Sequence, residues 1–175
     1  SYLAAERDAG AQETAAALTV LAEILGGGQT SVLSEKLQFE TQTAIYTGAF
    51  YSGVSMDDTT FDFVVVPAEG ISLEAAEAAL DKVIAEFLTT GVDGAQLERI
   101  KMQIRAADIY ARDDVERAAN RYGRALTTGL TVADVQAWPE ILQAVTADDV
   151  MAAARDVLDR RRSVTGWLMA EEVSQ

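Results

Sequence analysis

The chain has 175 residues, of which 49% are hydrophobic and 24% charged, with a net charge of −14 and neither His nor Cys. This length and composition predict one folded domain with a sizeable core. The missing residue types exclude Ser-His and Cys-His nucleophiles and the usual zinc ligands, and the acidic balance argues against nucleic-acid or anionic-membrane partners.

The first predicted elements are a short strand over residues 1–5 and a helix over residues 13–25. Apolar residues recur at helical spacing in the second range. Three consecutive glycines then end the helix as a structural turn: Gly26, Gly27 and Gly28. A phosphate-binding loop would instead follow a strand and open a helix. We expect Thr30 or Ser31 to cap a shorter second helix, which reaches about residue 39.

Two strand-like runs follow, over residues 44–51 and 61–66. Ser, Asp, Thr and Gly fill the stretch between them, as is typical of a connection between paired strands. Pro67 closes the second run, where a missing N–H costs little. The pattern predicts an antiparallel hairpin.

The second half of the chain predicts several helices. Ser72 caps a long amphipathic helix that Gly91 ends, and further helices are expected over residues 93–110 and 114–126. A Thr stands three residues before an Asp in residues 131–134 and again in residues 146–149. Each pattern resembles a capping box and predicts another helix start.

A last strand is predicted over residues 163–169, where apolar and other residues alternate. The element order therefore places strands at both ends of the chain and a hairpin near its middle. The expected fold class is α+β, a mostly antiparallel sheet with helices packed on one face. Trp138-Pro139 is expected to fill the core at a helix junction.

Acidic residues are the remaining source of chemistry, because 28 Asp and Glu are present. Carboxylate pairs can perform acid–base catalysis, and an all-carboxylate site would suit Mg²⁺ or Ca²⁺. Adjacent acids such as Asp57-Asp58 and Asp148-Asp149 point apart on a helix, and no calcium-loop spacing is present. Solvated acids at turns and caps are the better interpretation.

Three stretches, taken together, resemble the pitrilysin/insulinase-type zinc metallopeptidases. Residues 21–33 read LAEILGGGQTSVL and are similar to an ILGGG passage in the C-terminal half of those enzymes. Residues 91–101 read GVDGAQLERIK, and residues 145–150 read VTADDV after glycines at 123 and 129. Both are similar to later segments of the same half, so the resemblance spans nearly the whole chain.

The resemblance implies a zinc site in another half of the protein, built from an H-x-x-E-H helix and a distal Glu. This chain has no such motif, so we expect no catalytic residue, no metal ligand and no cofactor in it. Residues 1–175 are then a single C-terminal domain from a longer chain whose zinc-binding N-terminal half is absent. The lack of a Met and of a cationic leader at the start agrees with a processed or excised piece.

In many members of the family the non-zinc half supplies an Arg and, seven residues later, a Tyr that hold the substrate carbonyl. The corresponding stretch, residues 37–45, has Gln38 in place of the Arg and Ile45 in place of the Tyr. Tyr46 lies one position later, so on a regular strand its side chain would face the other side. The resemblance implies that the pair is lost, as in the zinc-bearing type of subunit, with a doubly degenerate subunit as the alternative.

The resemblance implies the non-catalytic half of a zinc-dependent endopeptidase, which closes the peptide-binding chamber and contributes to substrate binding and subunit assembly. No activity is expected from this chain alone. The implied partners are the zinc-bearing N-terminal domain, a homologous second subunit in a dimer and an extended peptide substrate, in a bacterial periplasm or cytoplasm. The alternatives are a structural scaffold subunit of the same fold and a small acidic enzyme acting through carboxylate pairs.

Overall fold

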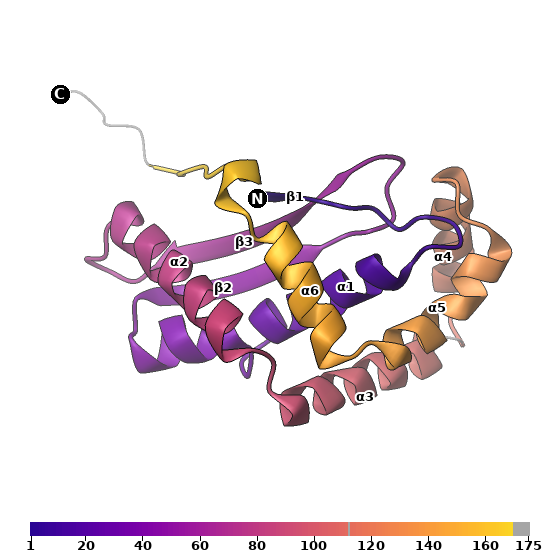
Figure 1. Cartoon of the computed structure of the whole chain (residues 1–175), viewed down its shortest axis with the longest axis horizontal. Coiled ribbons are helices and arrows are strands. Elements are labelled where there is room, and N and C mark those ends of the chain that lie inside the picture. The colour runs from indigo at the N-terminus through magenta and orange to yellow at the C-terminus, as the bar shows by residue number, and fades with distance from the viewer. Residues whose placement is uncertain (112, 170–175) are drawn as a thin grey trace.

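The computed structural model of the chain describes residues 1–111 and 113–169 (Figure 1). Its strands are β1 (Tyr2–Ala4), β2 (Ala44–Tyr51) and β3 (Thr59–Pro67). Its α-helices are α1 (Glu13–Gly26), α2 (Leu73–Thr90), α3 (Gly94–Ala111), α4 (Val115–Thr127), α5 (Val132–Ala144) and α6 (Ala147–Val157). A π-helix, η1 (Ser34–Glu40), follows α1, and a 3-10 turn, η2 (Arg160–Arg162), follows α6.

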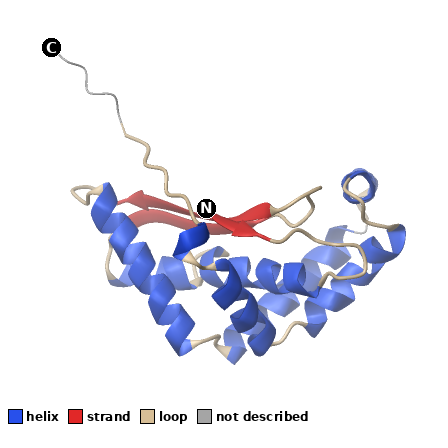
Figure 2. Ribbon diagram, turned by 45° about the horizontal axis from the view of Figure 1, so that its top comes forward, coloured by secondary structure: helices blue, strands red, loops and turns tan. Residues whose placement is uncertain are grey.

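The strands form one antiparallel sheet among the described residues, in the order β1-β3-β2. Figure 2 shows the sheet along one side of the molecule, with the helices packed on the other. Helix α1 lies at the centre of the core because it contacts β2 on one side and α5 and α6 on the other. Its Leu18, Leu21 and Leu25 are almost completely buried. The predicted α+β class and the antiparallel hairpin are confirmed.

The helix starts follow the capping signals in the sequence. Ser72 and Asp114 accept hydrogen bonds from backbone N–H groups in the first turns of α2 and α4. Thr131 and Thr146 each form a complete capping box with the Asp three residues later. Gly91 ends α2 with a φ of 86°, a conformation that favours glycine. These predicted boundaries are therefore confirmed.

The segment after the glycine turn differs from its prediction in the type of helix. Residues Ser34–Glu40 form a π-helix rather than an α-helix, and the Thr41 N–H donates to the Lys36 carbonyl five residues earlier. A hydrogen bond of a π-helix spans one more residue than that of an α-helix, and these rare segments often occur at functional sites. Apolar spacing alone does not distinguish the two forms over so short a segment.

The predicted last strand, residues 163–169, is wrong. Only Ser163 forms a bridge, antiparallel to Tyr2, and residues 164–169 have no strand assignment. A strand needs a backbone partner along its length, and among the described residues the backbone bonds of this segment to β1 and Ser1 reach only as far as Val164. The alternation of side chains predicted an extended backbone, but it does not indicate whether another strand lies beside that backbone.

The expectation that Trp138-Pro139 lies at a helix junction is also wrong, because both residues lie inside α5. Pro139 removes one N–H from that helix. Trp138 is half-buried and packs against the main core. No helix in the described part of the chain combines the length and the hydropathy that crossing a membrane requires.

Candidate functional site

A cluster of polar side chains lies between η1 and β2, behind the glycine turn. The buried Ser34 hydroxyl donates to the Gly28 carbonyl oxygen at 3.0 Å and lies 3.3 Å from the Thr47 hydroxyl oxygen. The Gln38 amide donates to both of these hydroxyl oxygens, at 3.0 Å to Ser34 and 2.7 Å to Thr47. We call Gly28, Ser34, Gln38 and Thr47 the Gln38 cluster. Its hydrogen bonds direct the Gln38 amide toward the protein interior.

Ile45 lies at an irregular point of β2. The pairing of β2 with β3 passes from Ala44↔Pro67 directly to Tyr46↔Val66, so Ile45 is the extra residue of a β-bulge. Its side chain is 67% exposed, and that of Tyr46 is 47% exposed. The bulge interrupts the strict alternation that would have placed these two neighbours on opposite sides. Gln38 bonds to buried hydroxyls while Ile45 meets solvent, so the structure does not bring the two into one pair.

The sheet presents an apolar surface on the side away from the helices. Five of its side chains are between 40% and 48% exposed, and we call them the open face: Leu3, Tyr46, Phe50, Val64 and Val66. Gly48 lies between Tyr46 and Phe50 on β2, and a Cβ there would come within 2.9 Å of the Phe50 ring and 3.1 Å of the Tyr46 hydroxyl oxygen. The absence of a side chain at Gly48 leaves room for both of these side chains over the strand.

The glycine turn holds α1 against the sheet. A Cβ on Gly26 would lie 2.7 Å from both Cα and Cβ of Ala49, and closer still to the Ala49 nitrogen. Gly28 has a φ of 86°, and its carbonyl accepts the hydroxyl protons of Ser31 and Ser34. The turn thus gives close packing of α1 on β2 and anchors the Gln38 cluster.

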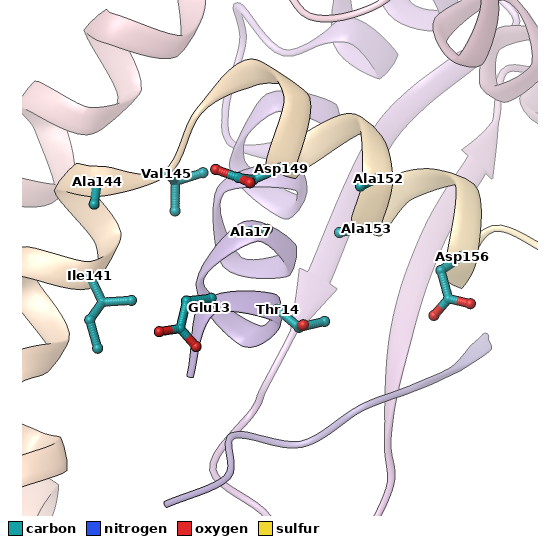
Figure 3. Close-up of a pocket in the computed structure, with 10 residues that line it drawn as sticks. All are labelled: Glu13, Thr14, Ala17, Ile141, Ala144, Val145, Asp149, Ala152, Ala153 and Asp156. Atoms are coloured by element: carbon teal, nitrogen blue, oxygen red, sulfur yellow. The ribbon is translucent and has the colours of Figure 1, made fainter. Parts of the chain in front are cut away.

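One cavity of about 440 Å³ opens between α1, α5 and α6 (Figure 3). Its floor contains the small side chains of Ala17 and Ala153, and its rim carries the carboxylates of Glu13, Asp149 and Asp156. Hydrogen bonds from the Thr146 side chain and backbone lower the pKa of Asp149. Asp149 therefore stays ionised and is committed to its helix cap, which makes it a poor general acid.

Metal-ligating residue types do not gather elsewhere in residues 1–111 and 113–169. No group of three or more Asp and Glu side chains there could hold a metal ion. His and Cys are missing from the whole sequence. The described residues thus offer neither the ligand set of a catalytic zinc site nor a cluster of carboxylates for a harder cation.

Sequence reasoning missed one buried charged network, centred on Arg7. The Arg7 guanidinium donates to the Gln12 side-chain oxygen and to the Asp134 carbonyl oxygen, and it stacks 3.9 Å from the centre of the Trp138 ring. Burial lowers the pKa of Arg7 to about 10, so it remains protonated at neutral pH. The Asp134 carboxylate accepts hydrogen bonds from Thr131 and from the Gly10 N–H. These contacts tie the loop before α1 to α5.

The Arg7 network is structural in character, since within residues 1–111 and 113–169 no buried side-chain nitrogen or oxygen lacks a hydrogen-bond partner. No local pattern identifies it, because Arg7 and Asp134 are 127 residues apart in sequence. The only signal was the capping box that contains Asp134, which predicted a helix start and not a contact with the other end of the chain.

A family model described as "Peptidase M16 inactive domain" matches residues 3–104. No curated protein matches the chain in sequence.

Several solved structures share the fold. The inactive peptidase domain of a candidate zinc protease from Bordetella parapertussis superposes with a TM-score of 0.84 at 18% identity, over 99% of this chain and 92% of that one. A candidate zinc protease from Bordetella pertussis gives 0.78 at 18% identity, over 92% of this chain and 86% of that one. A protease from Helicobacter pylori gives 0.82 at 17% identity over 92% of this chain, which spans only 38% of the length of that protein.

Proposed function

The chain belongs to the Peptidase M16 inactive domain family, and from this premise we propose that it closes the peptide-binding chamber of a zinc-dependent endopeptidase. It is the non-catalytic half of such an enzyme. The zinc and the residues that activate water belong to an N-terminal half of the same longer protein. In this proposal residues 1–175 form one C-terminal domain, which contributes shape and binding surface but no bond-breaking group.

The observation that carries the proposal is the combination of family membership with the residue inventory. A catalytic zinc site needs three protein ligands, usually His with Cys or a carboxylate. The chain has no His and no Cys, and the described residues gather no carboxylate cluster of that kind. In this proposal the zinc chemistry comes from a neighbouring domain.

The open face supports a role in binding peptide. Exposed apolar surfaces on folded domains often mark interaction sites, and extended peptides bind sheets through alternate side chains. Tyr46, Phe50 and the exposed valines of β3 offer such a surface on the side that the helices leave uncovered. We propose that this face lines the chamber and contacts apolar side chains of an extended substrate.

Gln38 and Ile45 support an arrangement in which a second subunit supplies the hydrogen-bond donors for the substrate. An Arg and a Tyr at these positions would donate hydrogen bonds to a substrate carbonyl, whereas Ile45 cannot donate and the Gln38 amide is held by Ser34 and Thr47. We propose that these positions are substituted substrate-grip positions. The missing donors then come from a homologous second subunit that closes over the same peptide.

The test is complementation between the two halves. The zinc-bearing half of the longer protein and the present chain are produced separately, and cleavage of a fluorogenic peptide is measured for each alone and for the mixture, with the homologous subunit present throughout. We expect no turnover from this chain, and a rate for the zinc-bearing half that rises roughly 100-fold when this chain is added, because closure positions the substrate. Turnover by this chain alone, or an unchanged rate in the mixture, contradicts the proposal.

The loss of both grip residues favours a second candidate function, that of a structural scaffold without peptidase activity. The same assay distinguishes the two. A scaffold gives no cleavage by the intact longer protein with any homologous subunit, although the domains still associate. A matched pair of variants tests the grip positions. Gln38→Arg with Ile45→Tyr is expected to reduce the dependence on the second subunit. The control, Phe39→Arg with Ile45→Leu, places the Arg one position away and changes Ile45 only conservatively, so it is expected to leave that dependence unchanged.

A further inference from the structure

The cavity between α1, α5 and α6 continues into a second hollow along the seam between α1 and α6. The two hollows have volumes of about 440 Å³ and about 150 Å³, and Thr14, Ala153 and Asp156 line both of them. The second hollow reaches Asp58, in the loop before β3, and Arg162 of η2. We call the two hollows together the acidic groove. Because the groove extends over several elements, it can contact more than one side chain of a partner.

The floor of the acidic groove is apolar, and its side chains are small. Ala17, Ala152 and Ala153 line it, with Ile141 and Val145 at the α5 end (Figure 3). Methyl side chains leave the space above them open for a long side chain from a partner. Lys and Arg bury their methylene stems along apolar surfaces of this kind and keep their charged ends at a polar edge.

The edge of the acidic groove is negatively charged. Glu13 and Asp149 stand at the first hollow, whose described lining contains no Lys or Arg. Asp58 adds a carboxylate at the second hollow, where Arg162 pairs with Asp156 at 3.1 Å. In the described part of the chain the groove therefore carries four carboxylates and one cation, which is already paired.

Two of these carboxylates have acceptor oxygens without a partner among the described residues. The Glu13 side chain, at the start of α1, makes no hydrogen bond or ion pair there. Asp149 receives both hydrogen bonds from Thr146 on Oδ2, at 2.9 Å from the N–H and 2.6 Å from the hydroxyl, which leaves Oδ1 available. An ionised carboxylate can accept about four hydrogen bonds. The groove thus offers acceptors for cationic donors above an apolar floor.

We propose that the acidic groove docks a basic segment of a partner protein, whose Lys or Arg side chains lie over the alanine floor and end at the carboxylates. The net charge of −14 favours a cationic partner, because the summed field of the protein attracts opposite charge and speeds association. An apolar segment would cover the carboxylates without pairing them, at a cost in desolvation. Arg suits the groove best, since its planar guanidinium offers five donors and is more weakly hydrated than an ammonium group.

The groove and the open face lie on different sides of the molecule. The groove is formed in the helix layer, whereas the open face lies on the side of the sheet that the helices leave uncovered (Figure 2). A partner in the groove would therefore leave the proposed peptide-binding face accessible. The docking goes beyond the proposed function and does not depend on it.

Fluorescence anisotropy tests the proposal with the present chain and a labelled peptide in which Arg alternates with Ala. We expect saturable binding that weakens as salt is added, because salt screens the attraction between charges. The matched probe carries citrulline, which has the length of Arg but no charge, at every Arg position. It should bind at least about tenfold more weakly. Equal binding of the two probes would overturn the proposal.

A matched pair of double variants separates docking in the groove from general attraction to an acidic protein. Glu13→Gln with Asp156→Asn removes two exposed carboxylates of the groove, whereas Glu69→Gln with Glu74→Gln removes the same charge outside it. Glu74 lies in the first turn of α2 as Glu13 does in that of α1, so the cost to the helix start is matched. The first variant should bind the Arg peptide roughly tenfold more weakly, and the second less than about twofold. Equal losses would refute docking in the groove.

A second pair of variants tests whether the peptide occupies the floor. Ala152 is exposed on α6 and lines the groove, and Ala78 is exposed on α2 outside it. Leu is almost as good a helix former as Ala, so both Ala152→Leu and Ala78→Leu should fold. Ala152→Leu fills part of the floor and should weaken binding roughly tenfold, while Ala78→Leu should leave it unchanged. If the two variants bind the peptide equally well, the peptide does not enter the groove and the proposal fails.

A free polyamine is the remaining candidate occupant, because spermidine also combines methylene stems with cationic ends. We expect spermidine to displace much less of the labelled Arg peptide than the unlabelled peptide does at the same concentration, since a protein segment pairs with several carboxylates at once. Equal displacement would make the groove a site for small cations and would rule out the docking of a protein segment.

Discussion

Gly26 offers a sharp test of how α1 is fixed to the sheet. In Gly26→Ala the new methyl group would lie 2.7 Å from Cα and Cβ of Ala49, against an ordinary contact distance of 3.4 Å or more. Ala49 is buried and its closest atoms belong to the backbone, so no flexible side chain can move aside. The Ala49 nitrogen would lie closer still, so helix α1 and strand β2 would have to separate by more than about 0.7 Å, and overpacking of this kind typically costs about 1–3 kcal/mol.

The higher helix propensity of Ala offsets at most about 1 kcal/mol of that cost, and less at the last residue of a helix. We therefore expect Gly26→Ala to lower the free energy of unfolding by about 1–3 kcal/mol. Gly94→Ala is the matched control, because a Cβ at Gly94, the first residue of α3, meets no atom within 4 Å. It should change stability by no more than about 0.5 kcal/mol, or raise it slightly.

Urea unfolding followed by circular dichroism measures both variants. With a slope of about 1–3 kcal/mol per molar urea, the expected loss moves the midpoint for Gly26→Ala down by roughly 1 M. The midpoint for Gly94→Ala should stay close to that of the unmodified chain. A Gly26→Ala chain that is as stable as Gly94→Ala would refute the close approach of α1 to β2.

The remaining predictions concern the helix caps and pH. Hydrogen bonds from Thr131 and Gly10 lower the pKa of Asp134 in the folded chain. The ionised carboxylate therefore stabilises the fold fully above the pKa that Asp134 has in the unfolded chain, and this stabilisation is lost as the pH falls through the lower pKa of the folded chain. Asp134→Asn should therefore lower the melting temperature at pH 7, by a margin that narrows below about pH 4; a constant margin would contradict this. Thr146→Ala should lower the free energy of unfolding by about 1 kcal/mol, measured in urea, whereas Thr146→Ser should restore it.

The fold was predictable where the signal is local. A capping Ser or Thr fixes a helix start through its own hydrogen bond to the next turn, and Thr131, Thr146 and Ser72 all do so. The hairpin was predictable for the same reason, since β2 and β3 are neighbours in sequence. Such features depend on a few adjacent residues and on little else.

What could not be predicted depends on distant partners. Strand formation at residues 163–169 needs a backbone partner beyond Val164, and the bulge at Ile45 arises from its register with β3. The burial of Arg7 depends on Trp138 and Asp134, far away in the chain. The Gln38 cluster could be located by resemblance to a motif, but its inward hydrogen bonds to Ser34 and Thr47 required the structure.

The central claim is that this domain depends on a neighbouring domain for its zinc. Isothermal titration calorimetry with Zn²⁺ tests it most directly, with the present chain in one experiment and the longer protein, stripped of metal, in the other. We expect the longer protein to bind one zinc ion tightly and the present chain to show no saturable tight binding. Tight binding of one zinc ion by the present chain, through its own side chains, would contradict the account.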